Sequence, residues 1–502
     1  MKFPLKTFAP DVSPITPGIL VSVENAYPSE TGGLRATPTP SPVSSALAGT
    51  VKSSFSFQDV GLSYRHIAAT ASKLYELQGT GWTDVSNSTT SYGNVDRWRY
   101  ATWGNWVLAT DLNTPMQVQT ASLAAFTDLS GSPPQAKYIT TVKDFVVLSG
   151  LSGAYGNRIQ WCALGDATDW SPSLTTQAGY TDLLDTPSPV TAFCRMGDMF
   201  VAFKERAMYM GYYSGSPFTW TIQRIPVFSG CVASEAIIEL EGMIFYPGID
   251  DFYVFDGTYP KRIGAGIRDW FFGQVNRTYL TNMRVTYDVQ RRLIFWWYPT
   301  ATQGDDSIQE CLIYHVDSNR WGRMVQPINE VMNLWRAGIT YGTIPDWFPE
   351  YIDITNSGLT YGSAFWSSST FNMGVFGTDN KLAVMTGAPI TANLVTGDLG
   401  EQVGYSRIRN AWPYFNVEPD ACVTLARGKT LLGGAVTYGN GPTNSSWGGS
   451  WGSSFGTQPN NLKADGGVDL DLTAKFLSLD MTMYGDFDLI GYDADVRRVS
   501  KN

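Results

Sequence analysis

The chain has 502 residues, enough for about three domains of roughly 150 residues each and for a large buried core. Charged residues make up 16% of it and aromatic residues 14%, with 50 glycines and 27 prolines. This composition is typical of a β-rich globular protein with many tight turns and excludes a coiled coil, a collagen and a disordered chain. The net charge of −10 argues against a protein that grips nucleic-acid phosphates.

The cysteines indicate the compartment in which the chain folds. They are odd in number and include no C-x-x-C pair, which argues against a disulfide framework and a zinc site. We therefore expect reduced, mostly buried thiols, as in a cytosol, at Cys162, Cys194, Cys231, Cys311 and Cys422. Residues 1–20 lack the apolar core of a signal peptide, and the strongest apolar run, residues 293–298 (LIFWWY), is too short to span a membrane. We expect a soluble protein.

Residues 1–60 contain eight prolines and show neither a helical nor a strand period. Proline fixes φ and removes a backbone donor, so this segment is predicted to be an extended arm laid over the rest of the chain. A free terminal tail is the alternative interpretation. The apolar side chains of Ile15, Ile19 and Val23 favour an ordered arm, because a free tail does not need such anchors.

A repeat begins near residue 61. The pattern Thr-Asp-apolar-Ser occurs at residues 83–86, 127–130 and 168–171, spaced by 44 and 41 residues, and each copy follows a strand-like stretch. A period of about 40–50 residues with several short strands per unit is typical of propeller blades. Asp and Ser suit the turn after an outer strand. Strand-like runs without the motif follow at 199–203, 243–246, 252–255, 293–298, 311–316 and 381–385.

We therefore predict an all-β chain in which residues 61–387 form a six- or seven-bladed β-propeller. The best helical candidate is residues 264–275. Residues 388–502 are predicted to form a separate, β-sandwich-like domain. Residues 343–372 interrupt the strand rhythm with dense aromatic residues, so they are expected to form a loop that folds back or is covered by a partner.

Two aromatic segments are candidate interfaces. One lies in the insertion, and the other is a Gly- and Ser-rich loop at residues 447–456. Stacking on nucleic-acid bases is the alternative for the second loop, but no cluster of basic residues lies near it in sequence. The candidate interface residues are Trp347, Phe348, Tyr351, Trp366, Phe371, Trp447, Trp451 and Phe455.

The C-terminal segment is strongly acidic. From residue 465 to residue 496, Lys475 is the one basic residue. These carboxylates are a candidate acidic lining of a conduit, and a solvated face is the ordinary alternative. The candidate lining residues are Asp465, Asp469, Asp471, Asp486, Asp488, Asp493 and Asp495.

The sequence contains few residues of the kinds that enzymes use for catalysis. The two histidines, His66 and His315, lie in strand-like contexts, and the sequence contains no H-E-x-x-H, P-loop or G-x-S-x-G motif. Carboxylates at 250, 251 and 256 and at 305 and 306 are candidates for glycoside hydrolysis, which needs two carboxyl groups about 5–10 Å apart. The side chains of adjacent Asp residues usually point apart, so their adjacency in sequence is weak evidence for a pair of catalytic carboxylates. We expect no enzyme, no cofactor and no metal site.

Phrases along the chain resemble a known family. The opening carries Thr16-Pro17-Gly18, Asn25-Ala26-Tyr27-Pro28 and Gly32-Gly33-Leu34-Arg35. The middle carries residues 158–171 (RIQWCALGDATDWS) and 245–257 (FYPGIDDFYVFDG), and residues 474–499 contain a closing strand pair. Together they resemble the tail-hub or nozzle proteins of short-tailed bacteriophages, including the packaged-DNA stabilisation proteins. The insertion at 343–372 has no counterpart in that family.

The resemblance implies a structural virion protein, assembled in the host cytoplasm. It implies a homo-oligomeric ring, usually a hexamer, below the portal and adaptor, which holds the genome end and gives passage to double-stranded DNA during ejection. Tail fibres or spikes and a tail needle or plug are the further partners, without membrane insertion. An acidic channel wall would repel phosphates and let DNA slide. The alternative is a free β-propeller that binds or hydrolyses glycans.

Overall fold

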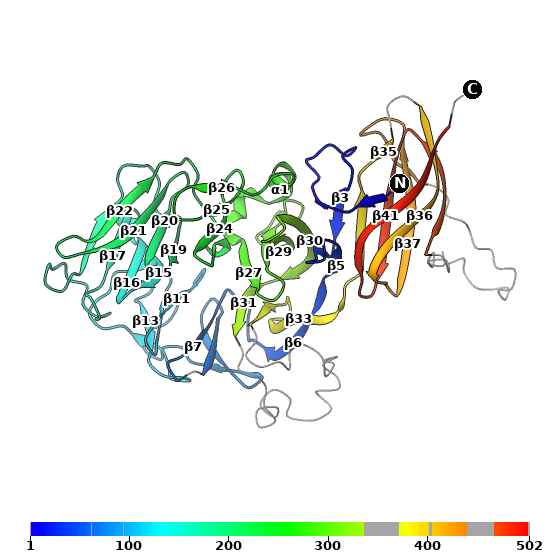
Figure 1. Ribbon diagram of the computed structural model, residues 1–502. Coiled ribbons are helices and arrows are strands. Elements are labelled where there is room, and N and C mark those ends of the chain that lie inside the picture. Colours follow the sequence, from blue (N-terminus) through cyan, green and yellow to red (C-terminus); the bar gives the residue numbers. More distant parts are fainter. Residues whose placement is uncertain are drawn as a thin grey trace.

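The computed structural model describes residues 2–61, 63–93, 95–335, 371–400, 404–438 and 466–499. Within them, the chain has one α-helix, α1 (Arg268–Gln274), and three short 3-10 helices, η1 (Gly153–Tyr155), η2 (Ser234–Ala236) and η3 (Arg277–Asn282). The predicted all-β class is confirmed, and α1 lies inside the predicted helical segment. Figure 1 shows an elongated molecule with a propeller at one end and a smaller β domain at the other.

Six separate four-stranded antiparallel sheets form blades within the described residues. The first three contain β7 (Ser53–Gln58), β8 (Tyr64–Ala69), β9 (Leu74–Gln78) and β10 (Gly81–Asp84); β11 (Arg99–Trp103), β12 (Trp106–Thr110), β13 (Gln117–Gln119) and β14 (Thr127–Asp128); and β15 (Ala136–Val142), β16 (Phe145–Leu151), β17 (Arg158–Trp161) and β18 (Gly179–Asp182). The other three contain β19 (Ala192–Met196), β20 (Met199–Phe203), β21 (Met208–Gly215) and β22 (Thr219–Ile225); β23 (Ile238–Leu240), β24 (Met243–Pro247), β25 (Phe252–Phe255) and β26 (Pro260–Arg262); and β31 (Glu330–Trp335), β32 (Phe371–Phe376), β33 (Lys381–Pro389) and β6 (Pro38–Ala46). This six-bladed arrangement matches the lower of the two predicted blade numbers.

The ring of blades is closed by β6, a strand from the N-terminal segment. β7, β11, β15, β19 and β23 pack side by side in that order, and β31 packs against β7. The outer strand of the blade that contains β31 is β6, which pairs antiparallel with β33. Figure 1 shows β6 and β33 next to each other at the lower edge of the molecule, near β31. The ends of the propeller are therefore joined by backbone hydrogen bonds, as in a β-barrel that leaves no open edge.

A ten-stranded sheet connects the propeller to the C-terminal domain. Its strands in order are β27 (Arg284–Asp288), β28 (Leu293–Pro299), β29 (Ile308–His315), β30 (Arg320–Ile328), β4 (Ala26–Pro28), β5 (Leu34–Ala36), β41 (Asp488–Val499), β36 (Tyr405–Val417) and β39 (Val468–Ala474), with β1 (Lys2–Pro4) paired to β41. All seven residues of β28 are buried, because separate apolar clusters cover its two faces. This explains why residues 293–298 form a continuous apolar run instead of an alternating one. β27 packs beside β31 and beside η2.

The C-terminal domain has a second sheet that faces the first. Its strands are β2 (Thr7–Phe8), β3 (Ile19–Glu24), β34 (Ala392–Thr396), β40 (Phe476–Tyr484), β37 (Ala421–Lys429) and β38 (Thr437–Tyr438), with β35 (Leu399–Gly400) paired to β40. Ile408 and Leu470 from the ten-stranded sheet lie in one buried cluster with Leu479 and Met481 from β40. Two sheets therefore share a core, as in a β-sandwich.

The N-terminal segment is built into both parts of the molecule. Instead of lacking strand structure, it contains β1 to β6, and the first blade begins within it at β7. β1 and β5 pair with β41, β3 pairs with β34, and β4 pairs with β30. β6, which has nine residues and three prolines, is the outer strand of its blade, a position at which the missing ladder donors are tolerated.

Two of the three predicted turn motifs lie where they were expected. Residues 83–86 and 127–130 end or follow the outer strands β10 and β14, and the Asp84 carboxylate accepts hydrogen bonds from the backbone N–H and the hydroxyl of Ser86. The copy at 168–171 lies between β17 and β18, so assigning it to the end of an outer strand was wrong. The outer strand of that blade is β18, Gly-Tyr-Thr-Asp, which matches β10, Gly-Trp-Thr-Asp, better than the predicted copy does.

Candidate functional site

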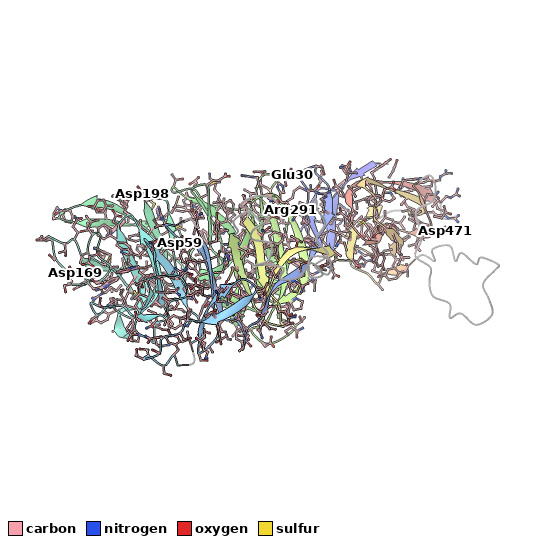
Figure 2. All side chains as sticks on the ribbon, turned by 90° about the horizontal axis from the view of Figure 1, so that it is seen from below. Glu30, Asp59, Asp169, Asp198, Arg291 and Asp471 are labelled. Carbon is pink, nitrogen blue, oxygen red and sulfur yellow. The ribbon has the colours of Figure 1, made fainter. Side chains whose placement is uncertain are left out.

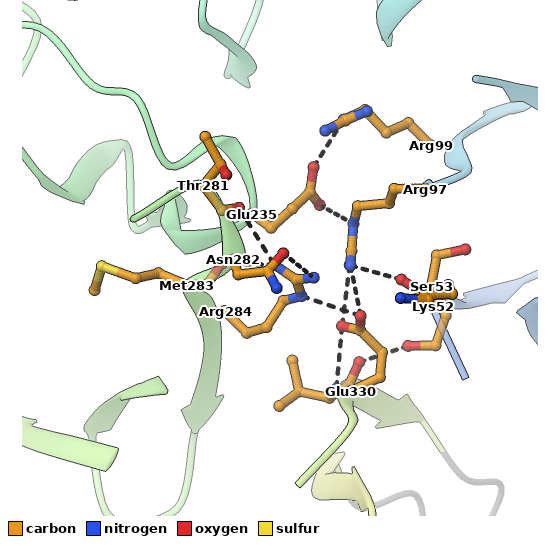
Figure 3. Close-up of polar contacts among 12 residues, drawn as sticks. Lys52, Ser53, Arg97, Arg99, Glu235, Thr281, Asn282, Met283, Arg284 and Glu330 are labelled. Atoms are coloured by element: carbon orange, nitrogen blue, oxygen red, sulfur yellow. Dashed lines mark hydrogen bonds and ion pairs between the residues drawn. The ribbon is translucent and has the colours of Figure 1, made fainter. Parts of the chain in front are cut away.

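A cluster of five charged side chains lies on the propeller axis (Figure 3). The cluster contains three arginines and two glutamates: Arg97, Arg99, Arg284, Glu235 and Glu330. Arg97 precedes β11, and Arg99, Arg284 and Glu330 are the first residues of β11, β27 and β31. Glu235 lies in η2, just before β23. Because the innermost strands of a propeller converge on its axis, residues at their starts meet although they are up to 233 positions apart.

The axial cluster is held by short ion pairs. Glu330 accepts from both terminal nitrogens of Arg97, at 2.5 and 3.0 Å, and from Nε of Arg284 at 3.0 Å. Glu235 accepts from Nε of Arg99 at 2.8 Å, and its other oxygen lies 3.3 Å from Nε of Arg97. Backbone carbonyls of Lys52 and Met283 accept further bonds from Arg97 and Arg284. The five groups therefore form one connected network.

The network is buried and remains ionised. The side chain of Glu330 is 1% exposed and that of Arg97 10%. Burial alone would raise the pKa of Glu235, but the guanidinium groups of Arg97, Arg99 and Arg284 lower it to about 2. Burial likewise raises the pKa of Glu330, but the guanidinium groups of Arg284 and Arg97 lower it by more, so the net shift of its pKa is downward. Charged side chains thus cross the axis of the propeller at this level.

A groove of about 640 Å³ lies at the outer edges of the blades that contain β22 and β26. Phe228, 88% exposed, and Tyr259 contribute aromatic rings, and Asp250 and Arg262 contribute a carboxylate and a guanidinium group. The Asp250 carboxylate accepts from the Tyr253 hydroxyl at 2.9 Å and from Arg262 at 3.1 Å. Grooves of this size that combine aromatic walls with a few polar groups are typical of small-ligand sites.

The structure separates the predicted catalytic carboxylates. Asp251 is buried and accepts from the backbone N–H groups of Phe252 and Gly264, and burial raises its pKa. Asp250, in contrast, lines the groove. Asp256 lies in the turn before β26, bound to Thr258 and Lys261.

The second predicted pair is elsewhere. Asp305 and Asp306 lie in the connection between β28 and β29, beside Ser307 and Asn282. Neither residue lines the groove that contains Asp250.

Most candidate interface residues lie outside the described part of the chain. These are Trp347, Phe348, Tyr351, Trp366, Trp447, Trp451 and Phe455. Phe371 is the first residue of β32, where its backbone is opposite Trp335 of β31.

The acidic candidates are more dispersed than the sequence suggested. Asp465 lies outside the described residues. Asp488 is 3% exposed, and its carboxylate accepts from Ser29, Thr31 and Asn416, so it is used inside the fold. Asp486 is exposed in the turn before β41.

The other four acidic candidates are partly or fully exposed on two strands: Asp469 and Asp471 on β39, and Asp493 and Asp495 on β41. β36 runs between these strands, and its Arg407 binds Asp471 with two bonds of 2.7 Å. The pKa of Asp471 is lowered by Arg407 and also by Arg409. A count of charges along residues 465–496 did not include these arginines because they lie on the neighbouring strand β36. The face of the sheet that carries Asp471 therefore has both negative and positive side chains. Figure 2 shows Asp471 on the domain at the end opposite Asp169.

The two histidines lie in strands, as predicted. His66 is in β8 and its Nδ1 contacts the Ser56 hydroxyl at 2.8 Å, while Nδ1 of His315 in β29 accepts from the Ser318 N–H. Among the described residues, no group of three or more His, Cys, Asp or Glu side chains is placed to hold a metal ion. No helix in the described ranges is long and apolar enough to cross a membrane.

No family model and no curated protein matches the chain. Solved structures with 9% sequence identity are similar to it. YCF48 bound to D1 peptide covers 72% of this chain and 95% of its own, with a TM-score of 0.35. The extracellular domain of the putative one component system BT4673 from B. thetaiotaomicron covers 80% and 47%, and BBS1N in complex with ARL6DN covers 70% and 96%, each with a TM-score of 0.39. At 9% identity and TM-scores below 0.5, these similarities do not indicate a function for this chain. The structure itself defines the class: a β-propeller joined to a second β domain.

Proposed function

We propose that the chain is a structural subunit of a phage tail nozzle, which forms a ring of six copies below the portal and adaptor and gives passage to the genome. The observation that carries the proposal is the ten-stranded sheet, whose backbone pairing runs from β27, packed beside the blade strand β31, to β39 in the C-terminal domain. Domains joined by a linker usually move relative to each other. A continuous sheet makes one stiff, elongated unit, which suits a subunit that bears load.

In this proposal DNA passes between copies and not through a propeller, because the axial cluster crosses the propeller axis and the cavity beside it, of about 170 Å³, is far too small for a duplex. Closed rings are built from heterologous contacts between identical chains. The interface would include the aromatic segments 343–372 and 447–456. Asp469, Asp471, Asp486, Asp493 and Asp495 remain candidates for the channel wall, with Arg407 moderating their charge.

We also propose that β27 to β30 act as a seventh blade shared with the C-terminal domain. β27 packs beside β31 on one side and η2 on the other, which is the position of an inner strand between β23 and β31. A blade that belongs to both domains would transmit force from one to the other.

Co-sedimentation with the portal and adaptor of the same virus tests the nozzle function. We expect the chain to sediment with the portal–adaptor complex at a fixed ratio, and to bind free duplex DNA weakly with a shallow salt dependence. No co-sedimentation would contradict the proposal. Tight DNA binding with a steep salt slope would contradict the non-adhesive channel.

The groove at Asp250 favours a second candidate function, glycan binding. Phe228 and Tyr259 offer exposed aromatic faces for the apolar faces of sugar rings, and Asp250 and Arg262 offer hydrogen-bonding groups for hydroxyls. On a glycan array we expect a bound oligosaccharide whose affinity falls at least about tenfold in Phe228→Ala. Phe218→Ala is the matched control, since Phe218 is also highly exposed, at 76%, and lies outside the groove. Equal loss in both variants, or no bound glycan, would exclude this function.

A further inference from the structure

Arg99 has hydrogen-bonding capacity that the chain does not use. Its Nε donates to Glu235, and its guanidinium group lies over the ring of Tyr138, with Cζ 4.7 Å from the ring centre. Neither terminal nitrogen has a hydrogen-bond partner among the described residues. Figure 3 shows Arg99 at the edge of the axial cluster, joined to it through Glu235 alone. The side chain is 15% exposed, so solvent reaches it.

A small cavity lies beside these nitrogens. It has a volume of about 170 Å³ and lies on the propeller axis, because its walls come from β7, β11, β15, β19 and η2. Its lining includes Arg97, Arg99, Tyr138, Phe193, Ser234 and Glu235. A cavity of this volume holds a carboxylate or phosphate group with water, whereas drug-sized ligands occupy roughly 300 Å³ or more.

The surroundings of the cavity carry excess positive charge. Three arginines face two glutamates in the axial cluster. Burial lowers the pKa of Arg284 and the nearby Arg97 lowers it further; the pKa of Lys137 is lowered by burial and by Arg99. Both directions are those expected for buried cations close to other cations, whereas the pKa of Arg97 is raised, because burial lowers it less than Glu330 and Glu235 raise it. In such surroundings an anion is attracted more strongly than it is in bulk water.

We propose that this axial cavity binds an oxyanion, a carboxylate or a phosphate group, through the two terminal nitrogens of Arg99. A planar guanidinium group donates two parallel bonds to such a group, which a lysine cannot do. The anion would neutralise the unbalanced arginine and complete the network across the axis. The group arrives either as a free ion or as a carboxylate at the end of a polypeptide. The inference rests on the axial cluster and holds whether or not the chain is a nozzle subunit.

Calorimetric titration of the full chain tests this site. The probes are sodium phosphate, sodium acetate and a short peptide with a free C-terminal carboxylate, each at constant ionic strength; the same peptide with an amidated end is the negative probe. We expect saturable binding of at least one oxyanion, weakened at least about tenfold in Arg99→Gln and less in Arg99→Lys, which keeps the charge but not the fork. Binding of phosphate or acetate alone identifies a free-ion site, and binding of the peptide identifies a docked carboxylate.

Two variants keep the test specific. Arg407→Gln removes an arginine that also binds a carboxylate, far from the axis, and is expected to leave binding unchanged. Ser234→Leu fills the cavity and leaves every arginine in place, so it is expected to abolish binding even if Arg99→Gln fails to fold. The proposal is overturned if no probe binds the unmodified chain saturably, or if Ser234→Leu binds as the unmodified chain does.

Discussion

Replacing Glu330 with alanine is expected to lower the free energy of unfolding by about 3–5 kcal/mol, the usual effect of removing one partner from a buried ion pair. Its carboxylate is the acceptor for Arg97 and Arg284, and without it Arg284 has no carboxylate partner in the axial cluster. Arg97 would keep Glu235, 3.3 Å away. The loss is therefore large because two buried guanidinium groups are affected by one substitution.

The shift of the urea unfolding midpoint, followed by tryptophan fluorescence, measures this effect. Asp471→Ala is the matched control, since it also removes a carboxylate that binds an arginine, but at an exposed position. We expect no measurable change in that control. Equal midpoints for Glu330→Ala and the unmodified chain would show that the axial cluster does not hold the blades together.

Removing the N-terminal segment is expected to have a still larger effect, in two separable steps. A chain without residues 2–36 loses β1 to β5 but keeps β6, so its propeller is expected to close while its C-terminal domain does not form. A chain without residues 2–46 also loses β6, which leaves β33 as an unpaired edge strand. An open edge of this kind exposes backbone donors and acceptors and promotes aggregation.

Limited proteolysis with mass spectrometry distinguishes the two steps. In the shorter deletion we expect protected fragments from residues 95–335 and 371–389, and cleavage within residues 404–438 and 466–499. In the longer deletion we expect cleavage in both regions and a loss of soluble chain. Deletion of residues 2–4, which removes β1 alone, is the control and should leave both regions protected. If the propeller is protected equally well in the chains without residues 2–36 and without residues 2–46, closure by β6 is contradicted.

Local patterns predicted the blades better than they predicted how the chain is assembled. The apolar runs at 199–203 and 293–298 and the helix near residue 270 are properties of a few neighbouring residues, and each was found. The third turn motif was misplaced because Thr-Asp-apolar-Ser describes a turn and not an outer strand. The pattern Gly-aromatic-Thr-Asp of β10 and β18 was the better signal.

The long-range features left little trace in the sequence. The strands of the N-terminal segment are rich in proline, which made them look unlike strands until their partners were known. The axial cluster joins Arg97 to Glu330 across 233 positions, and no spacing rule connects them. The carboxylates of β39 and β41 were grouped by sequence, whereas the arginine that binds Asp471 lies on β36, which precedes both.

Single-particle electron microscopy of the purified chain, alone and mixed with portal and adaptor, tests the proposed ring most directly. We expect a closed sixfold ring of about 331 kDa, six times the chain mass of 55.2 kDa, with its hole between the copies and each propeller axis closed. A single elongated particle under both conditions would contradict the nozzle function. A ring whose central hole coincides with a propeller axis would contradict the role given to the axial cluster.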